Sequence, residues 1–90
     1  MATVLTATGM VETTVEMYWQ VSQLRNRVLG QMRRAYQLEQ QYLATRRLCG
    51  AEHPATAKAR ASLERTWVNQ AETEKQLAAL LRQVEQGAAA

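Results

Sequence analysis

The chain has 90 residues, with eleven basic and eight acidic side chains and a formal net charge of +3. This length supports one small domain, which buries little apolar surface by itself and is expected to need a partner. The single Cys49 excludes an internal disulfide, and together with the single His53 it cannot complete a structural zinc site. Ala, Leu, Gln, Glu, Arg and Met dominate, with one proline, and this composition predicts an all-α fold.

Residues 1–10 are rich in Thr and Ala and contain Gly9, so we expect a flexible N-terminal arm there. They have neither a basic region nor a long apolar core, and no secretory leader is expected. No stretch approaches the ~20 apolar residues of a membrane span, so we expect an intracellular protein without a membrane partner. Thr13 and Glu16 fit a capping box, which indicates that the first helix begins near residue 11.

The rest of the chain predicts one helical hairpin over 11–86: a helix over 11–49, a turn at 50–53 and a helix over 54–86. A frayed tail is expected at 87–90. Gly50 suits the left-handed position after a helix, and Pro54 suits the first position of the next. The short turn makes the two helices antiparallel. Gly30 could divide the first helix, but the pattern continues in phase across it and favours a close approach of another helix or a mild kink.

Apolar residues recur at alternating spacings of four and three along the first helix, the pattern of a coiled-coil seam. On the second helix the ends of this seam are apolar, and its centre is polar but uncharged. The predicted core of the hairpin is Val21, Leu24, Val28, Leu38, Leu63 and Leu77.

A second apolar stripe flanks the seam on both helices, and a solitary hairpin would leave it in water. Burial of a large apolar side chain stabilises by ~1.5–3 kcal/mol. We therefore expect a long, coiled-coil-like antiparallel helical hairpin that dimerises into a four-helix bundle, or that packs on helices of other coiled-coil proteins. The predicted interface residues are Trp19, Leu29, Met32, Tyr36, Leu43 and Trp67.

No set of residues indicates catalysis, metal binding or cofactor binding, and we do not expect an enzyme. Cys49 and His53 lie at the predicted turn, where a helix end and a cap are the simpler interpretations. The first helix has six arginines and three glutamates, whereas the second helix with its turn is balanced. This excess charge permits contact with nucleic acid or with an acidic protein, although no base-reading motif accompanies it.

The turn and second helix carry His53-Pro54, Leu63-Glu64 and Trp67-Val68-Asn69. In these residues and in overall length the chain resembles the synaptonemal complex central element protein 3 family. The family is acidic, however, and has Asn and Phe where this chain has His53 and Trp67. The resemblance implies a self-assembling structural component of the central element in meiotic chromosome synapsis, located in the nucleus on chromosomes.

If the resemblance does not hold, we expect a cytoplasmic location. The residues themselves also leave two other classes of function open. The chain could be a small helical-hairpin chaperone or adaptor that binds a helix of a partner, as secretion chaperones do. It could also be a basic nucleic-acid-binding module.

Overall fold

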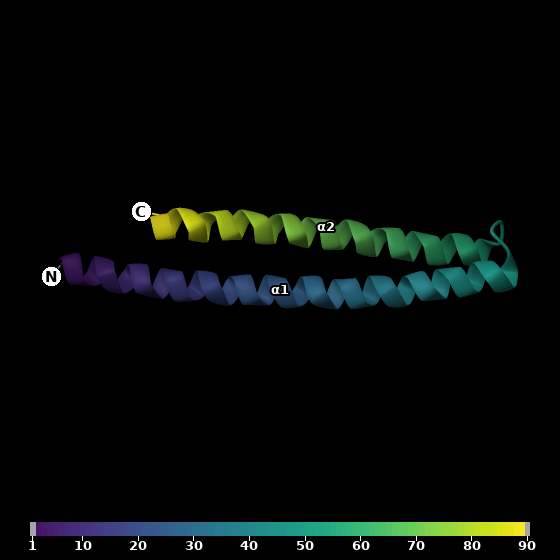
Figure 1. The fold of residues 1–90 in the computed structure, drawn as a ribbon, viewed down its shortest axis with the longest axis horizontal. Coiled ribbons are helices and arrows are strands. Elements are labelled where there is room, and N and C mark those ends of the chain that lie inside the picture. The colour runs from purple at the N-terminus through teal and green to yellow at the C-terminus, as the bar shows by residue number, and fades with distance from the viewer. Residues whose placement is uncertain (1, 90) are drawn as a thin grey trace.

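The structure, a computed structural model, describes residues 2–89, with side chains described for residues 15–87. It consists of α1 (Ala2–Cys49) and α2 (Pro54–Ala89), which run antiparallel, with the turn at one end and both termini toward the other (Figure 1). The molecule is a rod of 70 × 16 × 15 Å. The prediction of an all-α helical hairpin is therefore confirmed.

Both helices are longer than the sequence pattern predicted. The flexible arm was expected over residues 1–10, but α1 begins at Ala2, and residue 1 lies outside the described residues. Thr13 therefore lies inside the helix and is not its N-terminal cap. No proline precedes Pro54, and Gly9 costs only about 1 kcal/mol in a helix, so no residue there forbids helical geometry. α2 likewise continues to Ala89, past the expected end at residue 86, because alanine has the highest helix propensity.

α1 also passes through Gly30 without interruption, so this glycine does not divide the helix. A Cβ atom placed on Gly30 would meet nothing within 4 Å, which means that no close approach of α2 requires a glycine there.

The turn depends on backbone geometry and on two side chains. Gly50 has a φ of 94°, the left-handed conformation that ends many helices, and its N–H donates to the Arg46 carbonyl at 2.9 Å. At the start of α2, the Ala55 N–H donates to His53 Nδ1 at 3.0 Å, so His53 caps this helix. The Thr56 hydroxyl donates to the Gly50 carbonyl at 2.7 Å and links the two helix ends.

The core of the hairpin is a narrow seam between the helices. Its buried cluster is Ala35, Leu38 and Leu63, with Tyr42 packed against it in the half nearer the turn. The structure places Val21, Leu38 and Leu63 of the predicted core among the buried residues, and leaves Leu24, Val28 and Leu77 half-buried.

Thr66 and Thr73 occupy seam positions of α2, and their hydroxyls are satisfied within that helix. Thr66 donates to the Ser62 carbonyl and Thr73 to the Asn69 carbonyl, each at 3.0 Å. This bonding allows the buried Thr73 to take part in the seam without an unpaired polar group.

Candidate assembly interface

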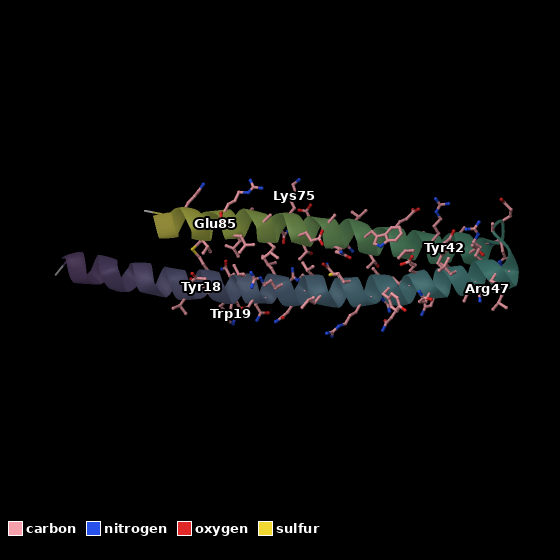
Figure 2. All side chains as sticks on the ribbon, viewed as in Figure 1. Tyr18, Trp19, Tyr42, Arg47, Lys75 and Glu85 are labelled. Atoms are coloured by element: carbon pink, nitrogen blue, oxygen red, sulfur yellow. The ribbon has the colours of Figure 1, made fainter. Side chains whose placement is uncertain are left out.

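The burial pattern of each helix repeats every seven residues, so positions a to g can be assigned with the seam at a and d. Val21 and Tyr42 take position a on α1, and Leu63 takes position a on α2. Position f then points away from the opposite helix. Figure 2 shows this outward direction for Trp19 and Lys75, whereas Tyr42 points toward α2.

On α1, the exposed large apolar residues concentrate at positions b and e, which flank position a on one side of the helix. Leu29, Met32 and Tyr36 are 52%, 49% and 64% exposed, although they lie in the centre of the hairpin. The full set at these two positions is Val15, Tyr18, Leu29, Met32, Tyr36 and Leu43.

On α2, the same two positions carry the half-exposed Trp67, the partly buried Leu81, and the small Ala71 and Ala78. Reversal of one helix in an antiparallel pair brings position e of both helices to the same side. A shallow groove confirms this geometry, because it is lined by Arg46 of α1 together with Arg60 and Trp67 of α2, all at position e.

The opposite side of the hairpin is formed by positions c and g of both helices. A second shallow depression lies there, lined by Gln41 of α1 and by Lys58 and Ser62 of α2. The two helices therefore contribute their b and e positions to one continuous side, which we call the apolar face.

Five of the six residues predicted for the interface belong to the apolar face: Leu29, Met32, Tyr36, Leu43 and Trp67. Trp19 does not, because it occupies position f at the outer edge of α1 (Figure 2). The apolar stripe predicted beside the seam also includes Val15, Tyr18 and Leu81, which lie at the same b and e positions, although the predicted interface set did not name them.

Charge on the apolar face is nearly balanced, with three arginines and four glutamates among the described residues. On α1, Arg25 and Glu39 lie seven residues before and after Met32, and all three occupy position e. On α2, Arg60 Nε and Glu64 Oε1 form an ion pair at 3.0 Å. This exposed pair contributes little to stability.

The residues considered for chemistry lie at the turn. His53 Nδ1 accepts the capping hydrogen bond from Ala55, and Cys49 is an exposed free thiol at the end of α1. Within the described part of the chain, no group of three or more His, Cys, Asp or Glu residues is placed to hold a metal ion. None of the described helices is long and apolar enough to cross a membrane.

Searches of protein-family models, curated proteins and solved structures find no match to this chain.

Proposed function

We propose that the protein is a non-enzymatic assembly module whose apolar face packs against the same face of a second copy to form a four-helix bundle. The observation that carries the proposal is the row of half-exposed Leu29, Met32 and Tyr36 along the middle of the rod. Each such side chain gains about 1 kcal/mol when its remaining surface is buried. An exposed apolar surface contributed by two helices is typical of a protein–protein interface.

The charges on α1 favour a second copy as the occupant. When two copies of α1 cross antiparallel at Met32, Arg25 of each copy lies opposite Glu39 of the other, because both are seven residues from Met32. Leu29 of each copy then lies near Tyr36 of the other. This surface is thus complementary to itself about a two-fold axis through Met32.

The arrangement also accounts for the small residues on α2. Ala71 lies between Trp67 and Glu74 on the apolar face, so a tryptophan from the second copy has space to pack there. Alternation of large and small side chains across facing positions is the usual means of close packing in helix bundles.

The first test of the proposal is the mass of the protein by light scattering. We expect a dimer, and we expect the variant Met32→Glu/Tyr36→Glu to be a monomer because it buries four carboxylates in the bundle. The matched control, Gln76→Glu/Gln83→Glu, adds the same charge at exposed g positions of α2 and should remain a dimer. A well-folded monomer of the unmodified chain would contradict the proposal.

The second test uses the native Cys49 as the attachment point for a nitroxide label, since the chain has no other cysteine. With the crossing at Met32, the turns lie at opposite ends and the two labels are about 50 Å apart, from the helical rise of ~1.5 Å per residue. If the turns lay at the same end, the labels would be about 15 Å apart, given helix spacings of roughly 8–10 Å. Pulsed electron paramagnetic resonance distinguishes the two distances.

The two more specific roles considered from the sequence, a helical chaperone or adaptor and a component of the central element, remain predictions. A chaperone or adaptor would use the same apolar face for a helix of its client, and it would be recovered one-to-one with that client on co-expression rather than as a dimer. A central-element role predicts localisation between paired meiotic chromosomes, and it would use the same dimer.

A further inference from the structure

The side of α1 opposite the apolar face, together with its outer edge at position f, forms a second distinct surface. Between residues 20 and 48, positions c, f and g of α1 contain four arginines, six amide side chains and no acidic residue. All of them are exposed. The arginines are Arg27, Arg33, Arg34 and Arg47, and the amides are Gln20, Gln23, Asn26, Gln37, Gln40 and Gln41. We call this set the arginine surface.

Glutamates that could neutralise these arginines lie elsewhere. Glu39 of α1 occupies position e on the apolar face, and Glu16 lies before the arginine surface begins. Among the described side chains the ion pair is Arg60–Glu64 of α2, so the four arginines of this surface pair with no described carboxylate. Their guanidinium groups are therefore available for an anionic ligand.

We propose that the arginine surface binds the phosphodiester backbone of nucleic acid without sequence specificity. Guanidinium groups bind phosphate oxygens in a bidentate manner, and amide side chains donate further hydrogen bonds to them. The four arginines extend over about 30 Å of helix, at ~1.5 Å per residue. This length spans many successive phosphates of a duplex, which carries one charge per ~1.7 Å of its axis.

The distribution of apolar residues favours nucleic acid over a membrane surface. A helix that lies on a bilayer inserts apolar side chains between its basic residues and the lipid. The large apolar residues on this side of α1 are Trp19 and Leu48, which are 62% and 84% exposed and lie at its two ends. No large apolar residue lies at positions c, f or g between them. In the proposed dimer the two arginine surfaces stay outside the bundle, but the inference does not depend on dimerisation.

The test is fluorescence anisotropy of a labelled 30-base-pair DNA duplex with the full chain at several salt concentrations. We expect binding at 50 mM salt that weakens steeply toward 200 mM. The variant Arg27→Gln/Arg33→Gln/Arg34→Gln should lose more than tenfold in affinity. Its slope of log K against log salt should fall by about 2.7, at ~0.9 for each phosphate that the variant no longer neutralises.

The matched control removes the same charge from α2, in the variant Arg65→Gln/Lys75→Gln/Arg82→Gln. These three side chains are exposed and lie outside both the apolar face and the arginine surface. The control should keep the affinity and the slope within about twofold. Circular dichroism and light scattering on both variants check that helix content and mass are unchanged.

Three results would overturn the inference. The first is no binding of the duplex at 50 mM salt. The second is an equal loss of affinity in the two variants, which would indicate attraction by net charge without a site on α1. The third is tighter binding to vesicles containing phosphatidylserine, or to poly-glutamate, than to the duplex at the same salt concentration.

Discussion

The two glycines near the middle of the chain provide an internal comparison, because the same substitution should change stability in opposite directions. Gly30 lies within α1 at an exposed outward position, and Gly50 has a φ of 94° in the turn. A Cβ atom would meet nothing within 4 Å at either site. Steric contact with the rest of the protein therefore plays no part, and backbone conformation alone decides the outcome.

The expected magnitudes follow from that conformation. Gly30→Ala should raise the free energy of unfolding by about 1 kcal/mol, because alanine has the higher helix propensity and restricts the unfolded chain. Gly50→Ala should lower it by about 1 kcal/mol, because the left-handed conformation costs an L-residue roughly 1–2 kcal/mol and the gain in the unfolded state offsets part of this. The free energy of unfolding of Gly50→Asn should lie between that of the unmodified chain and that of Gly50→Ala, since asparagine tolerates this conformation better than alanine.

The assay is thermal unfolding followed by circular dichroism, with all variants at one protein concentration because assembly makes the melting temperature depend on concentration. A change of 1 kcal/mol corresponds to roughly 4–8 °C for a chain of this size. Gly30→Ala should therefore melt several degrees above the unmodified chain, and Gly50→Ala several degrees below it. The reasoning is refuted if Gly30→Ala melts lower, or if Gly50→Ala melts higher.

Five further substitutions test the seam, the turn and an exposed control position by the same assay. Leu63→Ala should destabilise by about 2–4 kcal/mol, because Leu63 is 3% exposed, whereas Leu48→Ala should change little, because Leu48 is 84% exposed. Thr56→Val should cost about 1 kcal/mol by removing the hydrogen bond to the Gly50 carbonyl, and Thr56→Ser should restore stability if that bond is the cause. Gln31→Leu should stabilise by about 1 kcal/mol, because Gln31 Oε1 is buried without a hydrogen-bond partner; a lower melting temperature would show that the amide has a favourable role.

Much of the hairpin could be predicted from local signals. Gly50 and Pro54 mark the ends of the two helices at the turn, because one favours a left-handed backbone and the other a helix start. The alternating spacing of four and three residues identifies the seam, since helical periodicity fixes which side chains share a side. The same periodicity could not locate the outer helix ends, because Thr and Ala residues are compatible with both an arm and a helix.

The sequence by itself determined two long antiparallel helices, a seam between them and a stripe of apolar residues beside the seam on each helix. These features depend on the spacing of residues within one helix. Only the tertiary structure decided that Met32 and Tyr36 of α1 lie on the same side of the hairpin as Trp67 of α2. That relation depends on how one helix is rotated against the other, and side-chain packing across the seam sets this rotation.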